Sequence, residues 1–434
     1  MGALHTDLYQ ITMAAAYFSL GKADMRAAFE YFVRDMPKSR SFLLFCGLEQ
    51  ALEYLENLKF TDDQIEYLRE LQVFRHVSAE FFDYLREFRF TGDVWAMPEG
   101  TVFFAPEPAL WVEAPIIEAQ IVETALLSIL NFQTLVASKA ARVVIAAGGR
   151  PVAEFGTRRA HGAEAAVMAA RAAYVAGCPA TSNVEAGKRF GIPVVGTMAH
   201  SFVMSFDSER EAFKGYLDVF PESAIFLIDT YDTIAAAKLA AEFGEQVVGV
   251  RLDSGDIAAL AKDVRRILDE AGMRGTKIMA SGDLNEYKID ELIKSGAPVD
   301  SFGVGTEMAT SRDDPSLGGI YKLVEVLEGG RWIPKRKASQ NKATLPYRKQ
   351  VYRIYRDGIA DHDYICPHAE EHEGEPLLVK VMDRGRAIYR RTLEDARKRA
   401  SEQVDALPEP LKDIWKTARY PIRLSPRLEH VDQS

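Results

Sequence analysis

The sequence is poor in cysteine and has no excess of positive charge, and each shortage excludes a class of protein. Its three cysteines, Cys46, Cys178 and Cys366, lie far apart and in no C-x-x-C arrangement. This spacing indicates neither a disulfide framework nor a zinc knuckle. With 53 Lys and Arg against 63 Asp and Glu, the net charge of −10 argues against a nucleic-acid partner, because proteins that track phosphates carry a basic patch.

Long apolar runs are lacking as well. We find no segment that approaches the ~20 apolar residues a membrane span needs, and no signal-peptide pattern opens the chain. The sequence therefore predicts a cytoplasmic protein with no membrane partner. Its 434 residues, 47% of them hydrophobic, are enough for a large core, and we expect two domains.

What the sequence does contain is a repeated transition in its second half. Three apolar stretches run directly into short loops rich in glycine and aspartate: 247–256 (VVGVRLDSGD), 278–283 (IMASGD) and 302–306 (FGVGT). A buried parallel strand is a continuous apolar run, and the loop after it is where α/β proteins place their chemistry. Glycine lets backbone N–H groups approach an anion, and carboxylates can hold sugar hydroxyls or a metal. Any one loop is also explained as an ordinary turn, but three in succession favour a phosphorylated sugar as ligand.

Strands and helices alternate from Pro151 to about Tyr321. We expect strands near 152, 181, 193–195, 224–228, 246–251, 277–280, 299–302 and 321, and helices at 162–175, 208–219, 233–243, 257–271 and 285–294. Such alternation predicts a parallel sheet with crossover helices, and six to eight units favour a closed barrel over an open sheet. Before this region we expect a strand at 28–33, short antiparallel strands over 92–113 and a long helix over 116–147.

Further polar side chains follow other expected strands. Arg158 and Arg159 come after the strand at 152, and guanidinium forks suit phosphate and carboxylate oxygens. Thr197 and His200 come after the strand at 193–195. These residues also have plainer explanations. The arginines can form surface salt bridges, and His200 can be a structural hydrogen-bonding group. Asp232, which follows the expected strand at 224–228, can be a helix N-cap.

Seven short motifs occur in order along nearly the whole chain: 6–10 (TDLYQ), 154–159 (EFGTRR), 181–184 (TSNV), 196–201 (GTMAHS), 251–256 (RLDSGD), 281–283 (SGD) and 303–306 (GVGT). Together they resemble the nicotinate phosphoribosyltransferase family, as do 349–352 (KQVY) and 420–425 (YPIRLS). The resemblance implies an α/β fold, with an irregular TIM-like barrel over 131–335. It also implies a second, α+β domain built from both ends of the chain, 1–130 and 336–434.

The resemblance also implies an activity. Members of this family join nicotinate to 5-phosphoribosyl 1-diphosphate, giving nicotinate mononucleotide and diphosphate for NAD biosynthesis. ATP hydrolysis is coupled to the reaction through a phosphohistidine, and Mg²⁺ accompanies ATP and the phosphoribosyl substrate. A homodimer with its site at the subunit interface is the expected working unit.

Site residues follow by resemblance, motif by motif. His200 is the expected phosphohistidine, with Arg251 and Asp253 the other catalytic residues. Arg158 and Arg159 are expected to bind anionic oxygens, and the 5-phosphate is expected to bind at Gly282, Asp283, Gly305 and Thr306. Phe155 is expected on one face of the pyridine ring and Tyr9, from the neighbouring subunit, on the other. Thr197 and Ser182 are expected to contact nicotinate. No metal ligand and no role for His161 is implied.

Some positions bear on specificity or depart from the family pattern. Relatives that use nicotinamide carry an aspartate at the position of Ser182, so the sequence favours nicotinate, whose carboxylate a hydroxyl can bind. Tyr347 and Arg348 stand where a glycine is expected, which leaves that loop's conformation open. Cys366, His368 and His372 are too few and too loosely spaced for the zinc knuckle of some members. Two alternatives stay open: a quinolinate transferase without ATP coupling, and a catalytically silent phosphosugar-binding protein.

Overall fold

The computed structural model describes residues 2–337 and 344–429. The chain divides into two compact units, Met1–Leu135 with Ser316–Ser434, and Val136–Pro315. The first unit therefore contains both ends of the chain. The expected ranges 1–130, 131–335 and 336–434 place the second boundary further along, and the difference has a physical cause. The segment after Pro315 forms β12 (Gly319–Glu328), which pairs with β1 (Arg26–Val33) of the first unit, and β13 (Arg331–Pro334), which pairs with β12.

The first unit is organised around a seven-stranded antiparallel sheet. Its strand order is β13-β12-β1-β5-β3-β17-β18. The strands are β1 (Arg26–Val33), β3 (Asp93–Ala96), β5 (Pro108–Pro115), β12 (Gly319–Glu328), β13 (Arg331–Pro334), β17 (Val379–Asp383) and β18 (Arg386–Ala387). β1 is an interior strand, with β12 and β5 paired on its two sides, and it is buried along almost its whole length.

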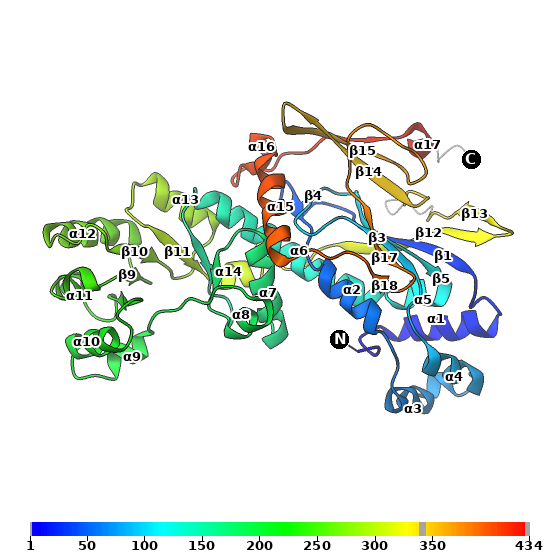
Figure 1. Cartoon of the computed structure of the whole chain (residues 1–434), viewed down its shortest axis with the longest axis horizontal. Helices are drawn as coiled ribbons and strands as arrows, with labels where there is room; N and C mark the ends of the chain where they lie inside the picture. Colours follow the sequence, from blue (N-terminus) through cyan, green and yellow to red (C-terminus); the bar gives the residue numbers. More distant parts are fainter. Residues whose placement is uncertain (1, 338–343, 430–434) are drawn as a thin grey trace. The chain divides into compact units, whose positions relative to one another are not determined.

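Smaller sheets and helices complete this unit (Figure 1). A four-stranded sheet has the order β16 (Glu375–Pro376), β14 (Lys349–Arg356), β15 (Ile359–Pro367) and β19 (Ile422–Leu424), and β2 (Leu43–Leu44) pairs with β4 (Val102–Phe103). The helices are α1 (Leu8–Ser19), α2 (Leu48–Asn57), α3 (Asp62–Glu70), η1 (Gln72–Phe74), α4 (Ala79–Glu87), α15 (Leu393–Asp405), α16 (Glu409–Lys412) and α17 (Pro426–Glu429).

The long helical stretch forms two helices, α5 (Ile116–Ile121) and α6 (Glu123–Ala146). α6 ends at Ala146, shortly before the expected stop at Gly148 and Gly149, which both have positive φ. By length and composition the stretch 116–146 could cross a membrane, which corrects the expectation that no segment approaches that length. Of its most apolar window, 61% is buried inside the protein, and a buried core helix has the same composition.

The second unit contains a six-stranded sheet in which every pair is parallel. Its order is β7 (Ala180–Thr181), β6 (Val152–Glu154), β11 (Ser301–Val304), β10 (Lys277–Ala280), β9 (Gly249–Leu252) and β8 (Ile225–Leu227). The helices are α7 (Ala163–Val175), α8 (Val184–Phe190), α9 (His200–Met204), α10 (Glu209–Val219), α11 (Thr233–Ala241), η2 (Gly244–Gln246), α12 (Ile257–Glu270), α13 (Glu286–Lys294) and α14 (Thr306–Ala309). The predicted α/β fold is confirmed.

Within the described residues, the strand pairing of this sheet stays open. Within the described chain, β7 and β8 form the two edges of the hydrogen-bonded sheet. The segment expected as a strand at 193–195 contributes a single parallel bridge, from Val194 to Thr181 on β7. The expected strand at Tyr321 exists, but its assignment to the parallel region was wrong, since it belongs to β12 and pairs antiparallel with β1.

Helices of the second unit begin directly after the strand-end loops, at polar capping residues. Asn183, Asp232, Asp256 and Asn285 each accept a hydrogen bond from a backbone N–H of the first turn of the helix that follows. Such caps satisfy donors that a helix start leaves unpaired. Asp232 therefore has the capping role foreseen as its plainer alternative.

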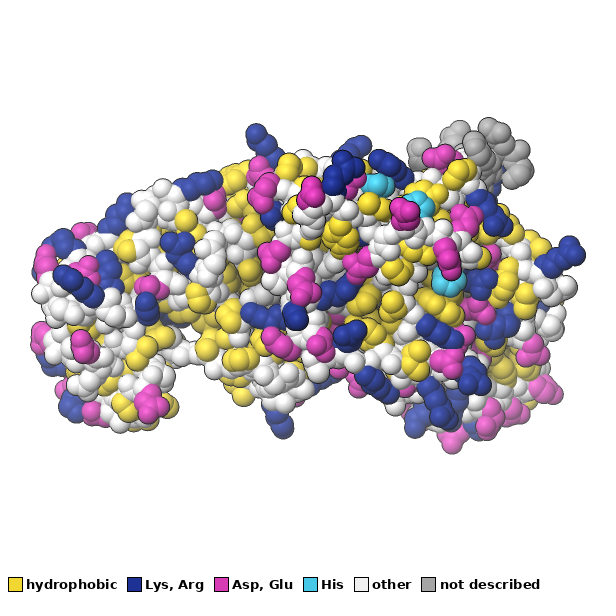
Figure 2. Space-filling view, turned by 45° about the horizontal axis from the view of Figure 1, so that its top comes forward, with side chains coloured by type: hydrophobic (Ala, Val, Ile, Leu, Met, Phe, Trp, Pro, Cys, Tyr) yellow, Lys and Arg dark blue, Asp and Glu magenta, His cyan; other side chains and the backbone are white. Residues whose placement is uncertain are grey.

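On the face drawn in Figure 2, acidic and basic side chains are interspersed.

Candidate functional site

The expected site residues of the second unit all lie at or after the carboxyl ends of parallel strands. Phe155, Arg158 and Arg159 follow β6, Ser182 follows β7, Arg251 is the next-to-last residue of β9 and Asp253 follows that strand, Gly282 and Asp283 follow β10, and Gly305 and Thr306 follow β11. Thr197 and His200 follow the Val194 bridge. Because all strands point the same way, these ends share one edge of the sheet.

Arg251 is the most constrained of the expected anion-binding residues. Its Nη2 donates to the carbonyl oxygen of Met198 at 3.1 Å, and its Nε is buried without a hydrogen-bond partner among the described residues. Burial lowers the pKa of Arg251, the carboxylates of Asp253 and Asp229 oppose this, and the guanidinium of Arg158 adds to the lowering. Arg158 therefore interacts electrostatically with Arg251, at an edge that also holds the carboxylates of Asp229 and Asp253.

Asp229 belongs to this cluster and was missed as a site residue. It follows β8, and its Oδ2 accepts hydrogen bonds from the N–H of Asp253 at 3.0 Å and from the hydroxyl of Ser254 at 2.6 Å. Its Oδ1 is buried and has no hydrogen-bond partner among the described residues. Its position after a buried strand was the available signal, as for the other site residues.

The loop after β10 depends on its glycine. Gly282 has a φ of +89°, and a Cβ there would lie 1.8 Å from the carbonyl oxygen of Asp253. Asp283 follows with a φ of +48°, a conformation that is uncommon for a residue with a side chain. The hydroxyl of Ser281 donates to Oδ1 of Asp253. The loops after β9 and β10 are thus packed backbone against backbone, and the carboxylate of Asp253 is held in place.

The ring of Phe155 lies against the backbone of β11. A Cβ on Gly303 would lie 2.5 Å from two ring carbons of Phe155. A Cβ on Gly305 would lie 2.9 Å from the carbonyl oxygen of Phe155. The N–H of Phe155 donates to the carbonyl of Val304 at 2.8 Å. Glycine at both positions therefore allows the loop after β6 to sit directly on the loop that leads to Thr306.

His200 is the first residue of the short helix α9 and is half-buried. Its Nδ1 lies 3.1 Å from Oγ1 of Thr230, which follows β8. This contact orients the imidazole ring and engages one of its nitrogens. Thr197, also half-buried, donates its hydroxyl to the carbonyl of Met198 at 3.2 Å, and Arg251 binds the same carbonyl.

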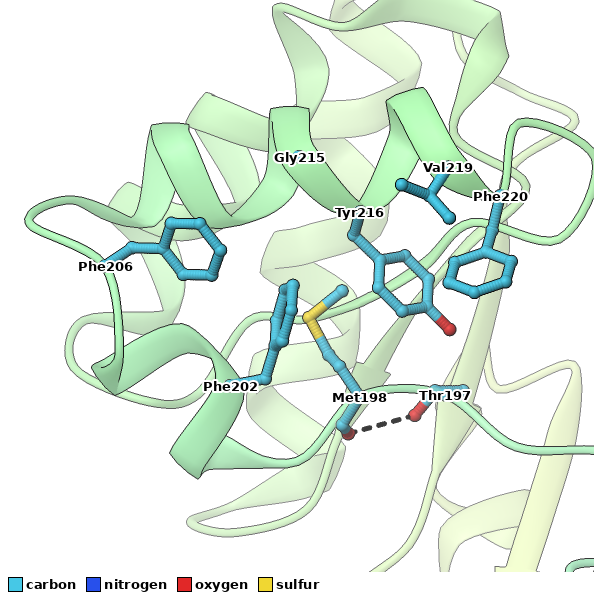
Figure 3. Close-up of a pocket in the computed structure, with 8 residues that line it drawn as sticks. All are labelled: Thr197, Met198, Phe202, Phe206, Gly215, Tyr216, Val219 and Phe220. Carbon is cyan, nitrogen blue, oxygen red and sulfur yellow. Dashed lines mark hydrogen bonds between the residues drawn. The ribbon is translucent and has the colours of Figure 1, made fainter.

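A groove of about 530 Å³ opens beside this segment (Figure 3). Its walls are almost entirely apolar and come from the 197–206 segment and from α10 and the residue after it: Thr197, Met198, Phe202, Phe206, Gly215, Tyr216, Val219 and Phe220. Figure 3 shows the side chains of Met198, Phe202 and Tyr216 pointing toward one another inside it. The segment that carries His200 therefore contacts the polar strand ends, through Thr230 and Arg251, and also lines the apolar groove.

Some residues singled out in the sequence make no side-chain hydrogen bond to this cluster within the described part of the chain. Arg158, Arg159 and His161 are exposed, and only Arg158 is linked to the cluster, through its effect on Arg251. Tyr9 lies on α1 of the first unit, where 49% of its surface is exposed.

The structure also answers the question of the loop without its expected glycine. Tyr347 has a φ of +70°, so the left-handed conformation is kept although the residue is not glycine. The ammonium of Lys349 donates to the carbonyls of Leu345, Pro346 and Tyr347 and pairs with the buried carboxylate of Glu30 at 3.0 Å. These bonds hold the loop in a conformation that a tyrosine adopts only under strain.

Fold and site together define a class of protein: an α/β protein with arginines, carboxylates and glycine loops for a phosphorylated ligand at one edge of a parallel sheet. Three family models match the chain: the nicotinate phosphoribosyltransferase (NAPRTase) N-terminal domain over residues 4–131, the NAPRTase family over 151–348, and the nicotinate phosphoribosyltransferase C-terminal domain over 368–432. The chain belongs to the nicotinate phosphoribosyltransferase family.

Individual relatives agree. The chain is 46% identical to nicotinate phosphoribosyltransferase pncB2 of Mycobacterium tuberculosis over 99% of this chain and 92% of the relative. It is 42% identical to nicotinate phosphoribosyltransferase of Bacillus subtilis over 98% of this chain and 93% of that relative. The crystal structure of human nicotinic acid phosphoribosyltransferase superposes with a TM-score of 0.87, at 28% identity, over 98% of this chain and 99% of that one.

Proposed function

We propose that this protein joins nicotinate to 5-phosphoribosyl 1-diphosphate, giving nicotinate mononucleotide and diphosphate for NAD biosynthesis, with ATP hydrolysis coupled to the reaction. The observation that carries the proposal is the joint placement of Arg158, Arg251, Asp253 and the Gly282 loop at one edge of the sheet, in a chain that matches the family over both units.

The proposed chemistry needs no protein nucleophile. The bond from ribose C1 to the diphosphate oxygen breaks as the pyridine nitrogen of nicotinate bonds to C1, and the transition state resembles an oxocarbenium ion. Arg158 and Arg251 would stabilise the charge that develops on diphosphate, and Asp253 would bind the ribose hydroxyls. Burial of Arg251 strengthens this effect, because a charge acts more strongly where water is excluded.

The 5-phosphate would bind at the loops after β10 and β11. Gly282, Asp283, Gly305 and Thr306 offer backbone N–H groups there, and the glycines let the backbone approach the phosphate oxygens. Arg159 would add a cation at the mouth of the site.

His200 would couple the reaction to ATP. An imidazole nitrogen attacks the γ-phosphate, ADP leaves, and hydrolysis of the phosphohistidine later releases phosphate. The contact between His200 and Thr230 supports this role, because a nucleophile must be held in one orientation. Coupling follows if the substrates bind the phosphorylated form more tightly than the free form.

Nicotinate would lie between aromatic rings with its carboxylate near hydroxyl groups. Phe155 offers one ring face, and Ser182 and Thr197 offer the hydroxyls. Tyr9 would cover the other face from the neighbouring subunit of a homodimer. Its exposure on α1 leaves it available for such a contact.

Mg²⁺ would enter with the substrates. Among the described residues no group of three or more His, Cys, Asp or Glu side chains is placed to hold a metal ion. The carboxylates of Asp229 and Asp253 both act on Arg251, the backbone N–H of Asp253 donates to Asp229, and the other Asp229 oxygen has no hydrogen-bond partner among the described residues. This pair suits Mg²⁺, which keeps several waters and substrate oxygens as ligands. Bound there, Mg²⁺ would neutralise negative charge on the phosphates.

One assay tests the proposal. Purified protein is incubated with nicotinate, 5-phosphoribosyl 1-diphosphate and Mg²⁺, with and without ATP, and mononucleotide formation is followed. We expect turnover that ATP stimulates. Tight substrate binding without diphosphate release would instead indicate a silent binding protein, and turnover of quinolinate without ATP would indicate the related transferase.

His200→Ala tests the coupling. The variant should lose ATP stimulation and ATP hydrolysis while it keeps slow ATP-independent turnover, because the substrates still bind but no phosphohistidine forms. His161→Ala, at an exposed histidine outside the proposed machinery, is the matched control and should keep the stimulation. ATP stimulation that persists in His200→Ala contradicts the phosphohistidine role.

A further inference from the structure

Glu154 is a buried carboxylate at the end of β6 that the proposed reaction does not use. Its side chain is 1% exposed. One carboxylate oxygen accepts a hydrogen bond from the N–H of Gly156, and the other accepts from the hydroxyl of Thr181 at 2.6 Å. The hydroxyl oxygen of Thr181 in turn accepts from the N–H of Asn183 at 2.9 Å. A single chain of hydrogen bonds thus ties the loop after β6 to the loop after β7.

These two loops carry the residues proposed to contact nicotinate. Phe155 lies between Glu154 and Gly156, and Ser182 lies between Thr181 and Asn183. The backbone adds a second tie, since the N–H of Ser182 donates to the carbonyl of Glu154 at 2.9 Å. The positions of Phe155 and Ser182 relative to each other are therefore set by bonds that neither side chain makes itself.

We propose that Glu154 and Thr181 are positioning residues that hold Phe155 and Ser182 at the spacing that selects a pyridine carboxylate. This inference rests on the proposed function, because it takes Phe155 and Ser182 as the nicotinate contacts. Glu154 and Thr181 do not touch the substrate; they act through the two loops.

The hydrogen bonds that join Gly156, Glu154, Thr181 and Asn183 require a particular set of donors and acceptors. An ionised Glu154 accepts two hydrogen bonds, while the Thr181 hydroxyl donates one and accepts one. With glutamine, one orientation sets its NH₂ group against the N–H of Gly156, and the other lets the NH₂ group donate to the Thr181 hydroxyl oxygen, which leaves the buried hydroxyl proton without its acceptor. Burial raises the pKa of Glu154, and its two hydrogen bonds counteract this.

A purely structural role would not require a carboxylate here. Burying a charge costs free energy, and an apolar pair of similar volume often joins two strands at least as well. What a hydrogen-bonded carboxylate adds is direction, because each bond fixes an angle as well as a distance. This directionality suits a pair of loops whose separation must match a small rigid ring.

The test compares Thr181→Val, which removes the hydroxyl and keeps the shape, with Thr181→Ser, which keeps the hydroxyl. We expect Thr181→Val to raise KM for nicotinate about tenfold, while KM for 5-phosphoribosyl 1-diphosphate and the rate of ATP hydrolysis stay unchanged. Thr181→Ser should restore the wild-type KM. Glu154→Gln, a second variant of nearly equal size, should raise the same KM, and Tm measurements show that each variant is folded.

The possible failures are distinct. Wild-type protein that does not turn over nicotinate overturns the proposed function and this inference together. Wild-type turnover with an unchanged nicotinate KM in Thr181→Val and Glu154→Gln overturns this inference alone. Equal rises in KM for both substrates, or no restoration by Thr181→Ser, would show a general effect on the fold and would also overturn it.

Discussion

Single residues in this site depend on atoms that lie far away in sequence. Gly282 is glycine because the carbonyl of Asp253 occupies the space where a side chain would begin. Arg251 is oriented by the carbonyl of Met198, from a different strand-end segment. In both cases the residue type suits a contact between two loops, so substitutions there test the site more sharply than substitutions of exposed groups.

Gly282→Ala should disrupt the phosphate loop. Its Cβ would lie 1.8 Å from the Asp253 carbonyl oxygen, and the φ of +89° is strained for alanine. We expect kcat/KM for 5-phosphoribosyl 1-diphosphate to fall at least about tenfold, which corresponds to ~1.4 kcal/mol. Gly275→Ala is the control, since a Cβ at Gly275 meets no atom within 4 Å. Equal kinetics in the two variants would contradict the importance of this loop.

Ser182→Asp should reduce the use of nicotinate. A carboxylate at this position repels the carboxylate of the substrate and favours an amide that can donate to it. We expect the ratio of kcat/KM for nicotinate to that for nicotinamide to fall by at least about tenfold. Ser182→Ala, which removes the hydroxyl without adding charge, should lower this ratio less. The idea fails if wild-type protein turns over nicotinamide with a comparable kcat/KM.

At the scale of elements, β14 and β15 are joined by a buried ion pair that a tyrosine hydroxyl and a further carboxyl group also approach. Arg353 of β14 binds Asp363 of β15 through two hydrogen bonds, of 2.9 and 2.6 Å, and the hydroxyl of Tyr420 donates to the same carboxylate at 3.1 Å. Glu107, fully buried, lies beside them. Burial and the neighbouring Asp363 carboxylate raise the pKa of Glu107 well above its usual range.

This raised pKa predicts a pH dependence of stability. The folded state binds the Glu107 proton more tightly than the unfolded state does. Its stabilising contribution is therefore complete below the unfolded pKa of about 4.3 and is lost as pH rises through the folded pKa, by ~1.4 kcal/mol per unit of pKa difference. Glu107→Gln keeps a neutral donor toward Asp363, so its Tm should fall less between pH 5 and pH 8 than that of wild-type protein.

The matched control is Glu53→Gln, at an exposed carboxyl of α2. Calorimetric Tm values at pH 5, 6, 7 and 8 are compared for the three proteins, and Glu53→Gln should follow wild-type protein throughout. Parallel Tm curves for Glu107→Gln and wild-type protein would show that Glu107 is ionised in the folded state across this range.

At the scale of the whole molecule, we propose that a second chain completes the site. Tyr9 belongs to the unit that contains both ends of the chain, and the other proposed contacts belong to the unit 136–315. If Tyr9 reaches the site of a partner subunit, a Tyr9 variant and a His200 variant that each lack ATP-stimulated turnover can restore it in a mixed dimer. This follows because one of its two sites receives both wild-type residues.

Complementation between Tyr9→Ala and His200→Ala measures this directly. The two variants are co-expressed with different tags, and ATP-stimulated turnover is assayed at low nicotinate. Random pairing should restore about a quarter of wild-type activity, because half of the dimers are mixed and half of their sites are intact. A single mass in solution that corresponds to one chain, or no restoration in an isolated mixed dimer, would contradict a shared site.

Much of this organisation could be predicted from the sequence, because it depends on local patterns. The alternation of apolar runs with capped helices predicted β6, β8, β9, β10 and β11, and it placed nearly every proposed contact at a strand end. The motifs around 154–159, 196–201 and 251–256 are contiguous in the chain, so their resemblance to one family could be recognised without any knowledge of the fold.

Only the tertiary structure decided which of these residues act on one another. It assigned β12 to the sheet around β1, added Asp229 to the cluster at Asp253, and tied Glu154 to Thr181. The physical reason is the same each time. These contacts join segments more than twenty residues apart, and no local pattern specifies which strand ends meet. The sequence by itself determined the kinds of groups in the site and their order along the chain; packing of the parallel strands determined their distances.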